Sequence, residues 1–325
     1  MLRLGVIGTN WITAQFIDAA YKQEAYQLSA IYSRHEATAQ ALADKVGVKA
    51  TIYTDLDAFF ASDLDVVYIA SPNSLHAPQT IQALTAGKHV IVEKPLAVNL
   101  KQLAAVDEAV QAHPDLMVFE AARHIYDANF KRINEFVATN DVSGATLSYM
   151  KYSSRYDAVL AGETPNVFSR QFGGGALMDL GIYLVYAAVA WFGVPNRATY
   201  QAKMLNTGVD GDGVMRLSYP DFDVTLITGK TKNSELTSEI YVGRDTLAFD
   251  QVGEIHHLTL KTETETTDLS QPIFDNPMEA EAKAFAEAIE TNDREAFKKA
   301  WTLANSVHQV MGQLRQSAGL HFDTK

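Results

Sequence analysis

The feature that most constrains the fold is a regular alternation, in the first third of the chain, between short apolar runs and helical patterns. The expected strands are 4–7, 28–32, 65–70, 89–93 and 116–119, and the expected helices are 12–20, 37–46, 74–86 and 100–112. Strands that are apolar throughout and separated by helices indicate a parallel sheet covered on both faces. The pattern therefore predicts a doubly wound α/β domain over residues 1–122.

Residues 123–325 follow a different pattern, because strands succeed one another there with turn residues between them. The expected strands are 145–152, 214–219, 222–228, 239–242, 246–249 and 255–260, with one long helix over 176–192 and two helices near the C-terminus. Consecutive strands of this kind predict a second α/β domain with a large, mainly antiparallel, open sheet. An uncovered sheet face is unfavourable to leave in water, so we expect a homodimer or higher homo-oligomer through this sheet.

Composition excludes several classes of function. The 325 residues contain no cysteine, which rules out disulfide bridges, thiolate metal sites and a cysteine nucleophile. A formal net charge of −12 disfavours nucleic acid and anionic membranes as partners. The longest apolar run, 184–194, is shorter than the roughly 18 residues of a membrane span. With no secretory signal and no such span, we expect a cytoplasmic protein. We expect no bound metal, because the aspartates between 210 and 223 lack calcium-loop spacing.

The first turn from strand to helix reads Gly8-Thr9-Asn10-Trp11-Ile12-Thr13. A dinucleotide fingerprint has three glycines, and here Asn10 and Thr13 stand in the second and third places, so the strict pattern fails. Asparagine tolerates a left-handed backbone better than other non-glycine residues, so the turn is still possible. An ordinary loop is the alternative. The position, after the first strand and at the start of a helix, favours a Rossmann domain that binds a dinucleotide.

The second strand ends in Ser33-Arg34-His35, and the first acidic residue is Glu36. NAD enzymes usually carry an acid at this point for the ribose 2′-hydroxyl, whereas a hydroxyl and a guanidinium suit a 2′-phosphate. The sequence therefore favours NADP(H) over NAD(H), with Ser33 and Arg34 as the reading residues. A solvated arginine at a helix start is the alternative.

Three further segments carry polar residues in a suggestive order. Ser71-Pro72-Asn73-x-x-His76 follows the third expected strand, and Glu93-Lys94-Pro95 follows the next. Ligands of open α/β sheets bind at the carboxyl ends of the strands, so both segments point to one crevice. Much later, a triple glycine at 173–175 leads to Asp179 and Tyr183, whose spacing places them on one helix face. Gly181 between them allows a close approach.

At these segments the sequence resembles the glucose–fructose oxidoreductase / inositol dehydrogenase (Gfo/Idh/MocA) family, and the resemblance covers essentially the whole chain. It implies nicotinamide-dependent hydride transfer to or from a hydroxyl or carbonyl carbon of a sugar, polyol or cyclic diol. It also implies that Lys94 is the catalytic lysine and that Pro95 often follows a cis peptide bond. Asn73 and His76 would line the nicotinamide side, and Trp11 and Ile12 would lie by the pyrophosphate and nicotinamide.

Elementary chemistry agrees with this assignment. Hydride removal from an alcohol must be coupled to loss of the hydroxyl proton. Tyrosine is a poor base at neutral pH unless a nearby ammonium stabilises its phenolate. Lys94 could supply that charge or hydrogen-bond the reacting oxygen, with Tyr183 as the acid–base and Asp179 orienting the substrate or the lysine. Many family members have histidine in place of Tyr183, and the tyrosine resembles the glucose–fructose oxidoreductase and dihydrodiol dehydrogenase branches.

Two alternatives share the fold. One is a dehydrogenase that prefers NAD, against which Ser33-Arg34 argues. The other is a non-catalytic regulator that senses a dinucleotide, against which the set of Lys94, Asp179 and Tyr183 argues. The family also often has an arginine after the strand that ends at Glu120. Arg123 lies two positions before the best-aligned place, Ile125.

Overall fold

The computed structural model describes residues 1–323 and contains two compact units. Unit 1 consists of Met1–Arg123 and Phe274–Thr302, and unit 2 consists of His124–Ile273 and the chain from Leu303 onward. Unit 1 thus includes a late segment, 274–302, that a division of the chain at residue 122 assigns to the second domain. The assignment of cofactor binding to the first domain and substrate binding to the second stays a prediction.

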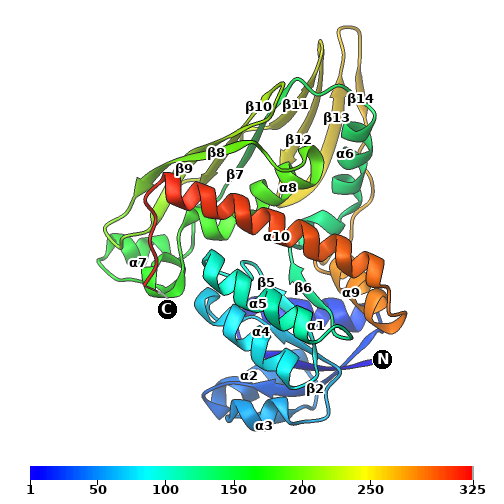
Figure 1. The fold of residues 1–325 in the computed structure, drawn as a ribbon, viewed down its shortest axis with the longest axis vertical. Helices are drawn as coiled ribbons and strands as arrows, with labels where there is room; N and C mark the ends of the chain where they lie inside the picture. Colours follow the sequence, from blue (N-terminus) through cyan, green and yellow to red (C-terminus); the bar gives the residue numbers. More distant parts are fainter. Residues whose placement is uncertain (324–325) are drawn as a thin grey trace. The chain divides into compact units, whose positions relative to one another are not determined.

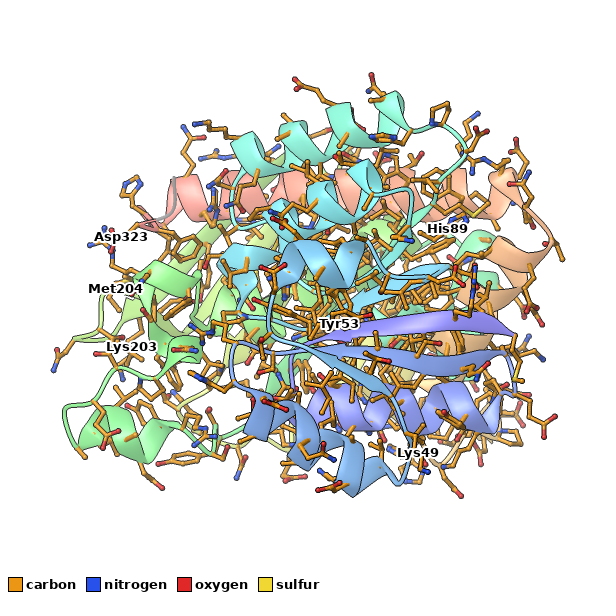
Figure 2. The ribbon with its side chains drawn as sticks, turned by 90° about the horizontal axis from the view of Figure 1, so that it is seen from below. Lys49, Tyr53, His89, Lys203, Met204 and Asp323 are labelled. Carbon is orange, nitrogen blue, oxygen red and sulfur yellow. The ribbon has the colours of Figure 1, made fainter. Side chains whose placement is uncertain are left out.

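Unit 1 is built on the predicted parallel sheet, with six strands in the order β3-β2-β1-β4-β5-β6. The strands are β1 (Leu2–Ile7), β2 (Tyr26–Tyr32), β3 (Thr51–Tyr53), β4 (Val66–Ile69), β5 (His89–Glu93) and β6 (Val118–Ala121). Strand β3 was not predicted, because it is short, lies at the sheet edge and includes no buried residue (Figure 2, Tyr53). The sheet order reverses between β1 and β4, and this switch point is where such sheets bind ligands.

Helices flank this sheet on both sides (Figure 1). They are α1 (Trp11–Lys22), α2 (Glu36–Val46), α3 (Leu56–Phe60), α4 (His76–Thr85), α5 (Leu100–Ala112) and the late helix α9 (Glu279–Glu290). Helix α9 belongs here because its apolar face packs on the sheet, where the Phe285 ring stacks on Phe119 at 4.8 Å between centroids. The Asn276 side chain also donates to the carbonyl of Gln15 at 2.9 Å. Burial of these side chains, rather than closeness in sequence, recruits the segment.

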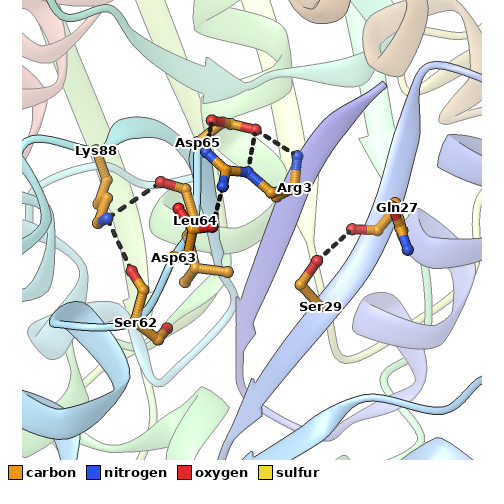
Figure 3. A network of polar contacts seen from close by, with 8 residues as sticks. All are labelled: Arg3, Gln27, Ser29, Ser62, Asp63, Leu64, Asp65 and Lys88. Atoms are coloured by element: carbon orange, nitrogen blue, oxygen red, sulfur yellow. Dashed lines mark hydrogen bonds and ion pairs between the residues drawn. The ribbon is translucent and has the colours of Figure 1, made fainter.

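The amino ends of the central strands are fastened by charged side chains (Figure 3). Arg3 donates to both carboxylate oxygens of Asp65, at 3.0 and 2.6 Å, and also pairs with Asp63. Lys88 donates to the carbonyls of Ser62 and Leu64. These contacts lie at the opposite end of the strands from the segments that carry the candidate site.

Unit 2 contains an eight-stranded sheet in the order β14-β13-β12-β11-β7-β10-β9-β8. The strands are β7 (Gly144–Met150), β8 (Arg197–Met204), β9 (Asp210–Ser218), β10 (Asp223–Gly229), β11 (Ser238–Val242), β12 (Asp245–Gln251), β13 (Glu254–Lys261) and β14 (Thr266–Asp268). The sheet is mainly antiparallel, as predicted, but β7 and β10 pair in parallel. Strand β8 was not predicted, because its side chains alternate between buried and exposed and its last two residues, Lys203 and Met204, are exposed (Figure 2).

The helices of unit 2 are α6 (Ala128–Ala138), α7 (Tyr156–Leu160), α8 (Ile182–Phe192) and the later part of α10 (Arg294–Ser317). Figure 1 shows α6 and α8 on one side of the eight-stranded sheet and draws no helix against the other side. Residues 170–192 form one helical stretch long and apolar enough to cross a membrane by length and composition. Its most apolar window is 78% buried inside the fold, so this is a core helix.

Candidate functional site

The first strand-to-helix turn requires glycine at position 8. Gly8 has a φ of +104°, and a Cβ there would lie 2.5 Å from the carbonyl oxygen of Ala70. The backbone after β1 therefore lies against the backbone after β4, at the switch point of the sheet. This is the tight turn that a dinucleotide site needs from its first glycine.

Asn10 acts differently from the expectation. Its backbone is extended, with φ −83°, so the suggestion that it adopts a left-handed conformation is wrong. Instead it caps α1, because its Oδ1 accepts from the amides of Ile12 at 3.0 Å and Thr13 at 3.3 Å. Its Nδ2 also donates to Ala70 O. The turn is therefore stabilised by an asparagine cap, and Trp11, two-thirds exposed, begins the helix.

Ser33 and Arg34 follow β2, beside the turn after β1. Ser33 Oγ lies 2.6 Å from Thr38 Oγ1, which in turn donates to the carbonyl of His35. The Arg34 side chain is exposed. The Ser33 hydroxyl therefore donates to Thr38 and is held at the strand end next to Arg34, a residue whose guanidinium is suited to a phosphate.

The segment after β4 is tied to the segment after β5 by one histidine. His76 is 1% exposed, and its Nδ1 lies 2.8 Å from Pro95 O while its Nε2 lies 2.7 Å from Ser71 O. Burial lowers the pKa of His76, while the contacts with the Pro95 and Ser71 carbonyls oppose that shift. His76 therefore joins the two segments through their backbones. Asn73 begins the short turn Asn73–Leu75 that follows Pro72.

Contacts on both sides of Lys94 fix its backbone. Tyr68 Oη donates to Glu93 Oε1 at 2.6 Å, and the Leu96 amide donates to Glu120 Oε1 at 2.8 Å. The Lys94-Pro95 peptide bond is cis, as the family resemblance implies. Lys94 itself is half-buried. Its position is thus set by buried hydrogen bonds immediately before and after it.

Beneath this segment lies a group of buried charges that the sequence did not reveal. Burial raises the pKa of Glu93, while the charges of Lys94 and Arg123 oppose that rise. Burial raises the pKa of Glu281 well above its ordinary value, and the negative charge of Glu93 adds to the effect. Within residues 1–323, neither carboxyl oxygen of Glu281 has a hydrogen-bond partner. The interaction of Arg123 with both carboxyl groups is consistent with a structural role for this arginine.

Unit 2 positions Asp179 and Tyr183 by an unusual helix start. Leu177–Gly181 forms a π turn that continues into α8, a feature often found at functional sites. The turn begins where the Leu177 amide donates to Asp210 Oδ2 at 2.7 Å. Gly175, with φ +114°, leaves no room for a side chain, because a Cβ would lie 2.1 Å from Asp210 Oδ1.

Tyr183 is 8% exposed and lies among aromatic rings. Its ring is 4.7 Å from that of His124 and 5.3 Å from that of Tyr149. A Cβ at Gly181 would lie 3.2 Å from Leu177 Cδ1 and 3.5 Å from Met215 Cε. The close approach predicted at Gly181 is therefore made by the protein's own core, which fixes the turn between Asp179 and Tyr183.

The residue that sequence reasoning missed is Lys230, which forms an ion pair with Asp179. It directly follows β10, and its ammonium also lies 4.8 Å from the centre of the Phe168 ring. The available signal was a lysine two residues after a predicted strand, which is weak by itself. Phe168 is fully buried and its ring is 5.9 Å from that of Tyr156.

The cofactor expectation can be tested against unit 1 alone. The turns after β2, β1, β4 and β5 follow neighbouring strands, so the predicted cofactor residues share the carboxyl edge of one sheet. The Gly8 turn, the start of α1 with no acidic residue in its first turn, and the donors at Ser33 and Arg34 fit a dinucleotide. Residues 1–323 contain no group of three or more His, Asp or Glu side chains that could hold a metal ion.

Comparison with known proteins agrees with this architecture. The family model GFO_IDH_MocA, described as an oxidoreductase family with an NAD-binding Rossmann fold, matches residues 2–121. The chain is 34% identical over 323 residues to the scyllo-inositol 2-dehydrogenase (NADP(+)) IolU of Bacillus subtilis, covering 98% of each chain. It is 39% identical over 295 residues to the uncharacterized oxidoreductase YgjR of Escherichia coli, covering 89% of each. The chain belongs to the Gfo/Idh/MocA family.

Solved structures show the same fold. A 3-ketoreductase from Actinomadura kijaniata, in complex with NADP and TDP-benzene, superposes with a TM-score of 0.82 at 21% identity, covering 96% of this chain and 98% of that one. The family model and the relatives named for dehydrogenation of sugars and polyols identify this Gfo/Idh/MocA member as an NAD(P)-dependent oxidoreductase. The names of these relatives argue against the alternative hypothesis that this protein is a non-catalytic regulator.

Proposed function

We propose that this Gfo/Idh/MocA member transfers a hydride between NADP(H) and a hydroxyl or carbonyl carbon of a sugar, polyol or cyclic diol. The observation that carries the proposal is the fixed backbone around Lys94, with Tyr68 bonded to Glu93 before it and Glu120 bonded to Leu96 after it. A backbone fixed in this way at the carboxyl edge of the sheet limits the positions from which the Lys94 ammonium can reach a reacting oxygen.

The preference for NADP(H) rests on the residues after β2. Ser33 and Arg34 stand there, and the chain has no carboxylate between the end of β2 and Glu36 to accept a ribose 2′-hydroxyl. Two of the relatives, from Bacillus subtilis and Haloferax volcanii, carry NADP(+) in their names. An NAD-preferring dehydrogenase of the same fold is the competing proposal.

Each candidate side chain has a distinct role in the proposed reaction. When bound, NADP(H) supplies the nicotinamide that accepts or donates the hydride. Lys94 donates a hydrogen bond to the reacting oxygen and stabilises its negative charge. Tyr183 exchanges the proton of the substrate hydroxyl, and Asp179 accepts from a neighbouring hydroxyl and so orients the substrate. The pyrophosphate is bound by the turn Gly8, Thr9 and Asn10, and Trp11 and Ile12 lie by the pyrophosphate and the nicotinamide. The nicotinamide side of the cofactor site is formed or supported by Ser71, Pro72, Asn73, His76 and Glu93.

The eight-stranded sheet supports a further part of the proposal. Figure 1 draws helices on one side of it only, and a large sheet face is commonly covered by a second subunit. We expect a homodimer or higher homo-oligomer through this face, in the cytoplasm, with no nucleic-acid or membrane partner.

The test is a fluorescence titration of the purified protein with NADPH and with NADH, after removal of any retained nucleotide. NADPH should bind at least about tenfold more tightly, as expected when charge-assisted hydrogen bonds to one phosphate are present. Turnover of NADP⁺ should then be measured with inositols, aldoses and cyclic diols. Equal affinity for the two nucleotides would favour the NAD-preferring alternative, and absence of turnover with every substrate would contradict the substrate class.

A further inference from the structure

Unit 2 contains a buried lysine whose partner is one of the proposed substrate-facing residues. The Lys230 side chain is 3% exposed, and its ammonium pairs with the Asp179 carboxylate, which is 34% exposed. The lysine thus contacts the carboxylate from inside the protein, while part of the carboxylate remains open to solvent.

The backbone on either side of this pair is firmly fixed. The Lys230 amide donates to Gly211 O at 2.8 Å, and the Lys230 carbonyl accepts from the Ser153 amide at 2.9 Å. Asp179 lies on the π turn, whose start is bonded to Asp210. Because the backbones that carry Lys230 and Asp179 are both fixed, the fold determines the direction in which the Asp179 carboxylate points.

Burying a lysine contributes little net stability to a fold. Removing an ammonium from water costs free energy that one ion pair seldom returns in full, and apolar replacements of such pairs are often equally stable or more so. A cation–π interaction with the ring of Phe168, whose centre lies 4.8 Å from the ammonium, offsets part of this desolvation free energy. What the pair does provide is a fixed positive charge beside the Asp179 carboxylate, which favours the ionised form and one orientation of that carboxylate.

We propose that Lys230 is a positioning residue, which holds the Asp179 carboxylate ionised and in the orientation that accepts a hydrogen bond from the substrate. The inference rests on the proposed function, since it specifies how one of the proposed substrate contacts works. Lys230 itself acts through Asp179.

Other titratable groups surround the pair. Asp210 is buried and its Oδ2 accepts from Tyr200 Oη at 2.7 Å. Asp212 pairs with Lys232 at 2.6 Å, and Lys232 is half exposed. Tyr149 and Tyr183 lie on the neighbouring strand and helix. Lys232 therefore offers a matched control: it is the same residue type, two positions along, paired with a different carboxylate.

The experiment compares the wild-type enzyme with the Lys230→Met, Lys230→Arg, Lys232→Met and Asp179→Asn variants and with the Lys230→Met/Asp179→Asn double variant. We measure kcat and kcat/KM for the best substrate of the panel from pH 5 to 9. Lys230→Met should lower kcat/KM by about 10- to 100-fold and move the acid limb of the profile to higher pH, because an ammonium favours ionisation of a neighbouring carboxylate. Lys230→Arg should restore most of the activity, and the KM for NADP⁺ should not change.

The remaining variants show whether Lys230→Met lowers kcat/KM because Asp179 loses its partner. The double variant should be no worse than Asp179→Asn alone, since the lysine then has nothing to orient, and Lys232→Met should resemble the wild type. A Lys230→Met enzyme with a lower melting temperature but a wild-type pH profile and kcat/KM would overturn the inference. If Lys230→Met does not fold, Lys230→Gln gives the same comparison with a polar side chain of similar length.

A measurement that does not need turnover distinguishes failure of the proposed function from failure of this inference. If the wild-type enzyme acts on no substrate of the panel, the Asp179 carboxyl is followed by ¹³C NMR in the wild type and in Lys230→Met, and its signal is identified by its loss in Asp179→Asn. A higher titration midpoint in Lys230→Met would support the control of Asp179 by Lys230 even then. An unchanged midpoint would overturn it.

Discussion

The two units position their chemically important side chains by different means. In unit 1, Ser33, Ser71 and Lys94 each follow the end of a parallel strand, and hydrogen bonds between side chains and neighbouring backbone groups, such as those of His76 and Glu120, help to fix these segments. In unit 2, Asp179 and Tyr183 lie on one helix start, and side-chain contacts with Lys230 and the neighbouring rings fix them. A regular sheet edge gathers residues that are distant in sequence, whereas a helix can only present neighbours and must rely on packing for their orientation.

This difference has a consequence for robustness. Backbone contacts survive most side-chain substitutions, so the geometry of the unit 1 segments depends mainly on His76, Glu120 and the Gly8 turn. The unit 2 arrangement depends on buried polar groups such as Lys230 and Asp210. Removing one partner of such a pair leaves the other buried without compensation.

The largest effects are expected at one residue from each unit. Lys94→Ala and Tyr183→Phe should each lower kcat by about 10²-fold or more, because each removes help to proton transfer or charge on the reacting oxygen. NADPH affinity should stay close to wild type in both, as measured by fluorescence titration. Undiminished turnover in both variants would contradict the catalytic assignment. A loss in one alone would show that the chemistry resides in a single unit.

A somewhat smaller effect is expected at the end of β2. Arg34→Ala should weaken NADPH by about 10- to 100-fold, since hydrogen bonds to a charged phosphate contribute roughly 1.5–3 kcal/mol. NADH should lose much less affinity. Lys45→Ala removes an exposed positive charge from the other end of α2 and should change neither affinity. An equal loss for both nucleotides in Arg34→Ala would mean that this residue does not contact the 2′-phosphate.

The smallest effect concerns stability and tests the buried charges of unit 1. The pKa of Glu281 is raised by burial, so the folded state binds a proton more tightly than the unfolded state. The stabilising contribution is complete below about pH 4.5, the ordinary value, and is lost as pH rises toward the elevated value. Glu281→Gln should remove this loss, and each unit of elevation corresponds to about 1.4 kcal/mol.

The measurement is the free energy of unfolding in urea between pH 5 and 9. Glu287→Gln, at an exposed position of the same helix, is the control and should keep the wild-type pH dependence. A Glu281→Gln protein whose stability falls with pH as steeply as the wild type would show that Glu281 is ionised in the folded state.

The sequence by itself determined the main architecture. Continuous apolar strands separated by helices can be buried only in a parallel sheet with helices on both faces, so the six-stranded core followed from pattern alone. The strand ends then fixed where Ser33, Ser71 and Lys94 would lie, because the carboxyl ends of parallel strands share one edge. Short or half-exposed strands such as β3 and β8 were missed, since they carry no continuous apolar run.

Only the tertiary structure decided the contacts between residues that are distant in sequence. Nothing in the local sequence indicates that 274–302 packs against the first unit, that Asn10 caps α1 while reaching Ala70, or that Glu281 lies near Glu93. The partner of Asp179 was likewise invisible, because Lys230 lies 51 residues away on another element. Local patterns report the period of a helix or strand, whereas a buried ion pair depends on which elements the core brings together.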